Sequence, residues 1–276
     1  ILIEDGFIVD LGTQVGKAEI EFDASGRLLT PSFIDSHTHP IFFSNRSNEF
    51  NQRLNGKSYQ SIADSGGGII SSINNVRNCT EDELFEHSMS HINYFVKHGT
   101  TVIEAKSGYG LTLEDELKSL RVIKKINKSS KIELIPTFMG AHDFPPEFKD
   151  NHDYYVDLIC DEMLPLVAEQ KLAEYCDVFC EKGYFTVSQS ERILETAKKY
   201  GLKPRLHADE FNDSGAALLA AKVGAVSADH LMEVSDLGIR ELAKNNVIAT
   251  LLPGTTFFLG RDNYADGRKM VDMGCQ

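Results

Sequence analysis

Two histidines separated by one residue, His37 and His39, are the side chains of this sequence most suited to chemistry. They follow Phe33-Ile34-Asp35, which we predict to be a short buried strand between Pro31 and Pro40. Side chains i and i+2 of a strand point to the same side, so both imidazoles should project together. Neutral imidazole binds zinc and iron, and the pair therefore predicts half of a metal site. Taken alone, two half-exposed histidines before a turn are the alternative.

The overall composition narrows the classes of protein. A chain of 276 residues can form one barrel-sized domain or two smaller ones. It has 28 basic and 41 acidic side chains, a net charge of −13, and its lysines and arginines form no long run. We therefore expect neither a nucleic-acid nor a membrane partner. No apolar run has membrane length, and no signal peptide opens the sequence.

The five cysteines are scattered and odd in number. We expect no disulfide framework and a reducing compartment, the cytoplasm. Cys176 and Cys180 lie four residues apart, but no second Cys/His pair lies near them in the sequence. We therefore interpret them as buried thiols rather than as zinc ligands.

Both ends of the sequence indicate a piece of a longer chain. The first residue is Ile1, and residues 1–12 predict a hairpin whose first strand is shortened. Residues 269–276 predict the end of a helix that leads toward a further strand. We expect a short apolar strand to come next.

Strand and helix patterns alternate between the two ends. Helices are predicted after two capping boxes, Thr80-Glu81-Asp82-Glu83 and Ser188-Gln189-Ser190-Glu191, the second ending at Gly201. The predicted strands are apolar runs without a polar face, as in parallel strands covered on both sides. They span residues 33–36, 101–105, 132–138, 177–180, 204–207, 225–228 and 247–252. The pattern predicts the α/β class and a (β/α)8 TIM barrel that lacks its last strand.

In such a barrel, chemistry occurs at the carboxyl ends of the strands. Histidines follow four of the predicted strands at this end. They are His37 and His39 after the first strand, His142 after the third, His207 after the fifth and His230 after the sixth. One such histidine is usually structural, but histidines from four strands at one face predict a functional site.

Several stretches of this chain resemble the amidohydrolase superfamily and, within it, the imidazolonepropionase family. Pro31 to Pro40 resembles the superfamily's metal signature, and the later histidines match its arrangement. The resemblance covers nearly the whole chain. The supporting stretches are Asn48-Glu49-Phe50 with Arg53, Ser65-Gly66-Gly67-Gly68-Ile69, Lys106-Ser107-Gly108-Tyr109-Gly110-Leu111, Gly140-Ala141-His142, Phe179-Cys180-Glu181-Lys182-Gly183, His207-Ala208-Asp209-Glu210-Phe211, Ser227-Ala228-Asp229-His230-Leu231 and Leu252-Pro253-Gly254-Thr255.

The resemblance implies a metal-dependent hydrolase. It implies one Zn or Fe ion per chain, held by His37, His39 and His207, with a fourth ligand, an aspartate at the end of strand eight, beyond this sequence. It also implies a partial β-sandwich segment in residues 1–30 and the barrel in residues 31–276. The implied reaction is hydrolysis of the ring amide of 4-imidazolone-5-propanoate to N-formimidoyl-L-glutamate in histidine catabolism.

Roles for the remaining residues combine this resemblance with general chemistry. Glu210 can move a proton between water and the leaving nitrogen, or can orient a ligand histidine. His230 can stabilise the carbonyl oxygen or relay a proton. Arg46 can pair with the propionate tail, although a loop arginine is more often solvated. Tyr109 and His142 would hold the ring, and Glu210 would also contact the substrate.

Alternatives remain at this stage. Some amidohydrolases bridge two metals with a carboxylated lysine, but Lys106 follows strand two, whereas Glu181 occupies the strand-four position, so we favour one metal. Another mononuclear amidohydrolase, such as a cytosine- or guanine-type deaminase, is the second interpretation, and an inactive metal-free fragment is the third. The expected partner is a small molecule with a carboxylate tail and, if the protein assembles, a second copy in a homodimer.

Overall fold

The computed structural model describes residues 1–57, 61 and 67–276, so Ser65 and Gly66 of the glycine-rich run lie outside the described residues. The chain divides into two compact units, Ile1–Ser32 and Phe33–Gln276. That residues 1–30 belong to a β-sandwich and residues 31–276 to the barrel domain stays a prediction.

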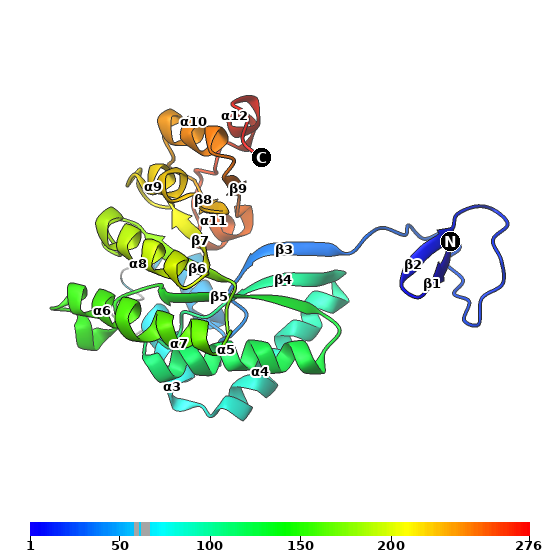
Figure 1. Cartoon of the computed structure of the whole chain (residues 1–276), viewed down its shortest axis with the longest axis horizontal. Helices are drawn as coiled ribbons and strands as arrows, with labels where there is room; N and C mark the ends of the chain where they lie inside the picture. Colours follow the sequence, from blue (N-terminus) through cyan, green and yellow to red (C-terminus); the bar gives the residue numbers. More distant parts are fainter. Residues whose placement is uncertain (58–60, 62–66) are drawn as a thin grey trace. The chain divides into compact units, whose positions relative to one another are not determined.

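The first unit contains the predicted hairpin. Strand β1 (Leu2–Glu4) pairs antiparallel with β2 (Phe7–Asp10) (Figure 1). The two connecting residues, Asp5 and Gly6, both have positive φ, 52° and 83°. This backbone suits the right-handed twist of a two-residue hairpin, and Asp-Gly is a favoured sequence for it.

The second unit is a nearly closed barrel of seven parallel strands, so the predicted fold class is confirmed (Figure 1). The strands pair in sequential order, with a helical connection after most of them. They are β3 (Phe33–Thr38), β4 (Thr100–Lys106), β5 (Glu133–Ala141), β6 (Tyr175–Cys180), β7 (Lys203–Ala208), β8 (Ser227–His230) and β9 (Ile248–Thr250). This order brings the carboxyl ends of all the strands to one face.

Helices cover the outside of the barrel, and α5, α8 and α9 pack on β5, β6 and β7 (Figure 1). The helices are α1 (Ser47–Leu54), α3 (Ile69–Asn78), α4 (Glu81–Lys97), α5 (Leu113–Ser129), η1 (Pro146–Phe148), α6 (His152–Leu158), η2 (Ile159–Met163), α7 (Leu164–Glu169), α8 (Val187–Lys199), α9 (Ala216–Val223), α10 (Asp236–Lys244), α11 (Pro253–Leu259) and α12 (Gly267–Asp272).

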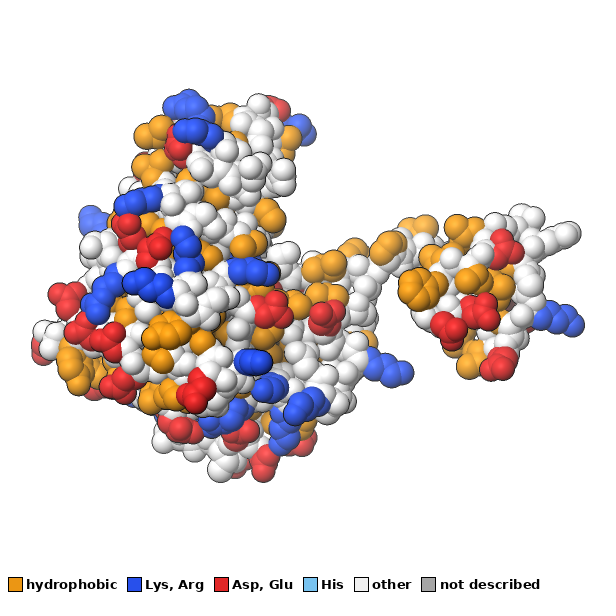
Figure 2. All heavy atoms as spheres, in the orientation of Figure 1, with side chains coloured by type: hydrophobic (Ala, Val, Ile, Leu, Met, Phe, Trp, Pro, Cys, Tyr) orange, Lys and Arg blue, Asp and Glu red, His pale blue; other side chains and the backbone are white. Residues whose placement is uncertain are grey.

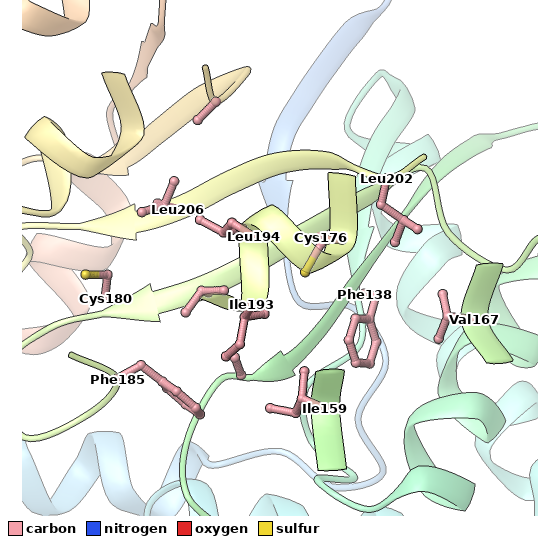
Figure 3. Close-up of a cluster of buried hydrophobic side chains, with 14 of the residues drawn as sticks. Phe138, Ile159, Val167, Cys176, Cys180, Phe185, Ile193, Leu194, Leu202 and Leu206 are labelled. Carbon is pink, nitrogen blue, oxygen red and sulfur yellow. The ribbon is translucent and has the colours of Figure 1, made fainter. Parts of the chain in front are cut away.

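The core between the barrel and its helices contains the two cysteines of β6. Cys176 and Cys180 are 1% and 0% exposed and lie among apolar side chains such as Ile193 and Leu194 of α8 (Figure 3). All five cysteines are unpaired. The buried-thiol interpretation is therefore confirmed. Alternation along the strand turns Asp177 to the opposite side, into the barrel.

The first barrel strand is less buried than its sequence predicted. Phe33 and Ile34 are 65% and 68% exposed, so the expectation of a buried strand was wrong. The reason is position: in the described part of the chain β3 pairs only with β4 and forms an edge of the sheet. An apolar run alone does not distinguish an edge strand from a central one.

The predicted helix ends were partly correct. The first capping box is confirmed, with Thr80 at the N-cap and Glu83 at N3. The second prediction was wrong, because α8 begins two residues earlier, with Thr186 at the N-cap and Gln189 at N3. Both tetrapeptides fit the same pattern, but Thr186 has the extended backbone that a cap requires. Gly201, with φ of 84°, follows the helix end as predicted.

The surface shows no single dominant charge on the face in view. Figure 2 shows acidic and basic side chains interspersed over the helices of the barrel unit. Within the described residues, the helices are too short or too polar to cross a membrane.

Candidate metal centre and substrate pocket

Three imidazoles meet inside the carboxyl end of the barrel. His37 comes from the end of β3, His39 from the residue after it, and His207 from β7. Nε2 of His39 lies 3.3 Å from Nε2 of His37 and 3.2 Å from Nε2 of His207. The sequence predicted this convergence, and nitrogens at such distances can share one ion at about 2 Å.

Carboxylates behind the ring nitrogens set the protonation of two histidines. Nδ1 of His37 lies 2.7 Å from Oδ2 of Asp229, and Nδ1 of His207 lies 2.9 Å from Oδ1 of Asp177. A carboxylate accepts a hydrogen bond, so each Nδ1 carries the proton and each Nε2 presents a lone pair. Burial, followed by the nearby Lys106 charge, also holds the pKa of His37 well below its usual range. Converging lone pairs repel each other, and a divalent cation between them fits this donor set.

A layer of charged side chains lies beneath the histidines, and we call it the ion layer. Its members are Glu104, Lys106, Asp177, Arg205 and Asp229. Nζ of Lys106 lies 2.8 Å from Oε1 of Glu104 and 2.7 Å from Oδ2 of Asp177. Nη2 of Arg205 lies 3.1 Å from Oδ2 of Asp229.

Each aspartate of the ion layer therefore joins one of the three converging histidines to a buried cation. Burial would raise the pKa of Asp177, but His207 and Lys106 outweigh it and hold that pKa well below its usual range. The Lys106 ammonium is fully buried in these ion pairs. An ion-paired lysine of this kind fits the interpretation of one metal rather than two.

No role was predicted for Asp177 or Arg205, and the contact of Asp229 with His37 was not foreseen. Their signal was present, because each is a charged residue inside a short apolar strand, where burial without a partner would be costly. What the sequence could not give was the pairing. Strand register places Asp177 beside Arg205 and His207 beside Asp229 across neighbouring strands.

A cavity of about 360 Å³ opens above the histidines. The size is typical of sites for small molecules. All of the residues predicted to act on or hold the substrate line this cavity, namely Arg46, Tyr109, His142, Glu210 and His230. The structure thus brings together four loop residues, each following a different strand, and His230, the last residue of β8.

Glu210 and His230 face each other at the edge of the metal centre. Oε1 of Glu210 lies 3.6 Å from Nδ1 of His230. Burial raises the pKa of Glu210 to about 7 and lowers that of His230 to about 3. Neither ring nitrogen of His230 has a hydrogen-bond partner among the described residues, and its φ of 79° is unusual for a residue other than glycine. Unpartnered buried atoms and a strained backbone are typical of functional positions.

His142 stacks on a ligand histidine. Its ring centroid lies 4.8 Å from that of His39, and its Nδ1 lies 2.9 Å from the carbonyl oxygen of Gly108. Because that oxygen only accepts, Nδ1 carries the proton and Nε2 is an acceptor. Burial lowers the pKa of His142 to about 3, so the ring stays neutral. The ring of Tyr109 lies beside it, with centroids 5.2 Å apart.

Two buried glutamates support the loops that form the cavity. Glu116 of α5 accepts backbone N–H groups of Gly108, Gly110 and Leu111, which flank Tyr109. Glu181, at the end of β6, accepts the N–H group of Phe211, the residue after Glu210. These contacts explain why glycine-rich and acidic stretches recur around the predicted site.

Of the arginines near the site, only some can meet a ligand. Arg46 and Arg53 line the cavity, and Nε of Arg46 donates to Oε2 of Glu49 over 2.8 Å. Arg77 lies outside it, because its guanidinium contacts the carbonyl oxygen of Gly110 and the carboxylate of Glu147.

Curated relatives match nearly all of this chain. The chain is 51% identical to an imidazolonepropionase from Brevibacillus brevis over 99% of its own length and 66% of the relative's. It is 46% identical to an imidazolonepropionase from Alkaliphilus metalliredigens, over 99% of this chain and 68% of the relative. The chain thus spans about two thirds of the length of the curated relatives it matches. No family model matches it.

Solved structures share the fold at low sequence identity. A guanine deaminase from C. acetobutylicum, with bound guanine, superimposes with a TM-score of 0.61 at 16% identity, over 89% of this chain and 59% of that one. An adenosine deaminase from Xanthomonas campestris, with bound zinc, gives a TM-score of 0.56 at 13% identity, over 89% and 54%. At these identities the likeness shows the barrel fold alone.

Proposed function

Because the chain belongs to the imidazolonepropionase family, we propose that the full-length protein hydrolyses 4-imidazolone-5-propanoate to N-formimidoyl-L-glutamate, a step of histidine degradation. The observation that carries this proposal is the set of side chains that line one cavity. Its floor is the cluster of His37, His39 and His207, and its walls present Arg46 and Glu210. Together these groups offer a metal site, a proton carrier and a contact for a carboxylate, which suits hydrolysis of a cyclic amide with a carboxylate tail.

We propose that His37, His39 and His207 hold one Zn or Fe ion per chain. Their converging nitrogens, with protons fixed on the far side of two rings, support the proposal. A structural neighbour with bound zinc supports it further. When bound, such an ion lowers the pKa of a water and polarises a carbonyl group.

The chain's own residues would move the protons. Glu210 would take one proton from the attacking water as the new carbon–oxygen bond forms. It would deliver that proton to the ring nitrogen as the carbon–nitrogen bond breaks. The products are the formimidoyl group and a carboxylic acid, and this acid loses the second proton of the water to solvent and becomes the carboxylate. His230, neutral and 3.6 Å from Glu210, would lie beside the developing oxyanion.

The walls of the cavity would orient the substrate. Arg46 offers a planar guanidinium, which pairs well with the propionate carboxylate. Nε2 of His142 would accept a ring N–H group, since its Nδ1 already donates to Gly108. Tyr109, next to His142, would cover the ring. These roles are proposals that follow from the position of each side chain in the cavity.

We also propose a location in the cytoplasm and assembly into a homodimer. The five unpaired cysteines support a cytoplasmic location. We propose a homodimer, which light scattering of the purified protein would test.

The direct test is turnover of the full-length protein with 4-imidazolone-5-propanoate, with the product identified by mass spectrometry. We expect N-formimidoyl-L-glutamate. Cytosine, guanine and adenine serve as competing substrates. Release of ammonia from one of these, with no reaction of the imidazolone, would contradict the proposal and favour a deaminase.

A further inference from the structure

The carboxylate of Glu49 makes contacts in two directions. Its Oε2 accepts a hydrogen bond from Nε of Arg46 over 2.8 Å, and its Oε1 accepts one from the backbone N–H group of Gly68 over 2.9 Å. Glu49 is the one buried residue of helix α1 (Ser47–Leu54). Burial of a carboxylate is costly unless its oxygens are used, and here both are used.

The contact with Glu49 determines which edge of Arg46 remains for a ligand. A guanidinium can pair with a carboxylate along its Nε–Nη edge or along its Nη1–Nη2 edge. Glu49 occupies Nε. Among the described residues, no hydrogen bond is made by Nη1 or Nη2 of Arg46, which lines the cavity. An incoming carboxylate can therefore meet only the Nη1–Nη2 edge in full.

The second contact ties this arrangement to a neighbouring helix. Gly68 is the N-cap of α3 and has φ of 72° and ψ of −151°, a conformation open mainly to glycine. Its N–H group points at Glu49 rather than at a residue of its own helix. A side chain that only stabilised the first turn of α1 would not need this link.

We propose that Glu49 is a positioning residue for recognition of the substrate's carboxylate. It holds the guanidinium of Arg46 with the Nη1–Nη2 edge toward the cavity and fixes it to the Gly68 turn. The inference rests on the proposed function, because it takes the ligand to be an acid with an imidazole-type ring. It adds a residue that contacts no reacting atom yet decides the affinity for the tail.

Two small probes separate the tail from the ring: imidazole-4-propionate carries both, and imidazole carries the ring alone. In Glu49→Gln of the full-length protein, the amide N–H group faces the N–H donor of Arg46, while the amide oxygen can still accept from Gly68. We expect calorimetry to show imidazole-4-propionate bound about tenfold more weakly, because one charge-assisted hydrogen bond is lost, with imidazole unchanged. KM for the imidazolone should rise similarly, with kcat nearly constant.

The control is Glu195→Gln, which removes the acidic partner of an exposed i,i+3 pair with Lys198 on α8. It should leave both affinities unchanged.

A double-mutant cycle with Arg46→Gln adds a second criterion. If Glu49 acts through Arg46, the double variant binds imidazole-4-propionate as weakly as Arg46→Gln alone. Additive losses would overturn the proposal. If Glu49→Gln does not fold, Glu49→Ala removes the acceptor without adding a donor.

The inference and the proposed function fail in different ways. Equal loss of imidazole and imidazole-4-propionate in the Glu49 variant would show a merely structural role and overturn the inference. Tail-specific loss in a protein that does not hydrolyse the imidazolone would support the inference and contradict the proposed function.

Discussion

Charged side chains are used differently in the ion layer and at the wall of the cavity. In the ion layer each cation pairs with carboxylates inside the barrel. At the wall, Arg46 pairs with Glu49 through Nε, and its Nη1–Nη2 edge makes no hydrogen bond to the described residues. Lys106 and Asp177 are both fully buried. Nζ of Lys106 pairs with Asp177 and Glu104, and Asp177 also pairs with His207. Arg46, by contrast, is 23% exposed, and in the described part of the chain it is fixed only through Nε. The same chemical groups thus serve as internal supports in one region, whereas in the other they line the cavity, where we propose that they contact the ligand.

This difference indicates which region orients the histidines and which region is placed to recognise a ligand. The ion layer comes from strand residues whose places are set by register, so it can fix the ligand histidines before anything binds. Much of the cavity wall comes from loops, and several of these loops are supported by glutamates such as Glu49 and Glu116. Changes in the layer should therefore affect folding and metal binding, and changes in the wall should affect kinetics.

The largest expected effect is kinetic and lies in the wall. Glu210→Gln should lower kcat by about 10²- to 10⁴-fold, the range for loss of a general acid–base group, while bound metal and stability stay the same. Steady-state kinetics and metal analysis of the full-length variant measure this. Glu195→Gln, which removes an exposed carboxylate of α8 that pairs with Lys198, is the control. A Glu210 variant with normal kcat would assign the proton transfer to another group.

The next effect concerns stability and lies in the ion layer. Lys106→Met leaves Glu104 and Asp177 without their shared cation, and breaking a buried ion pair costs about 3–5 kcal/mol of unfolding free energy. Lys198→Met, in an exposed pair with Glu195, should cost less than about 1 kcal/mol. Denaturant unfolding compares the two. Equal losses of unfolding free energy in the two variants would show that the buried ion pairs of the layer stabilise the fold no more than an exposed pair does.

A third prediction links the layer to the metal. In Asp177→Asn the amide no longer enforces a proton on Nδ1 of His207, so metal affinity should fall by about 10- to 100-fold. Chelator competition on folded protein measures it, with Asp157→Asn, a surface partner of Arg192, as the comparison. If both variants bind metal like the unmodified protein, the aspartate does not orient the histidine.

The smallest predicted change concerns the carboxylate anchor. Arg46→Gln should raise KM for the imidazolone about tenfold and change kcat less, because the tail is bound equally in ground and transition states. Arg77→Gln is not a suitable control for this assay, since Arg77 supports the loop of Gly110. Arg240→Gln, outside the cavity, is better. An unchanged KM in the Arg46 variant would move the anchor to Arg53, which also lines the cavity.

Much of the fold followed from periodicity, because parallel strands and their caps have local signals. The second capping box failed because two overlapping tetrapeptides satisfy one pattern, and only backbone geometry separates Thr186 from Ser188. The start of β8 also shifted: Ala225 was predicted in the strand, but its N–H group bonds to the carbonyl oxygen of Ala220 and closes helix α9. Helix ends of this kind depend on contacts that apolar content does not reveal.

The site was predictable to the extent that its residues lie at strand ends. His37, His39 and His207 come together because strand order brings those ends to one face. The partners behind them were not predictable, because the link between Asp229 and His37 joins residues 192 positions apart. The link between Glu49 and Gly68 depends likewise on how two helices meet. Such pairings are properties of packing rather than of local sequence.

We propose above that three histidines, oriented by the ion layer, hold one metal ion on which hydrolysis depends. Metal titration of the chelator-treated full-length protein, alongside its His39→Gln variant and with turnover of the imidazolone recorded in the same samples, tests it most directly. We predict one zinc or iron ion per chain, with activity returning in proportion to bound metal, and loss of both in the variant. Equal metal binding by the variant, or full activity without metal, would contradict the account.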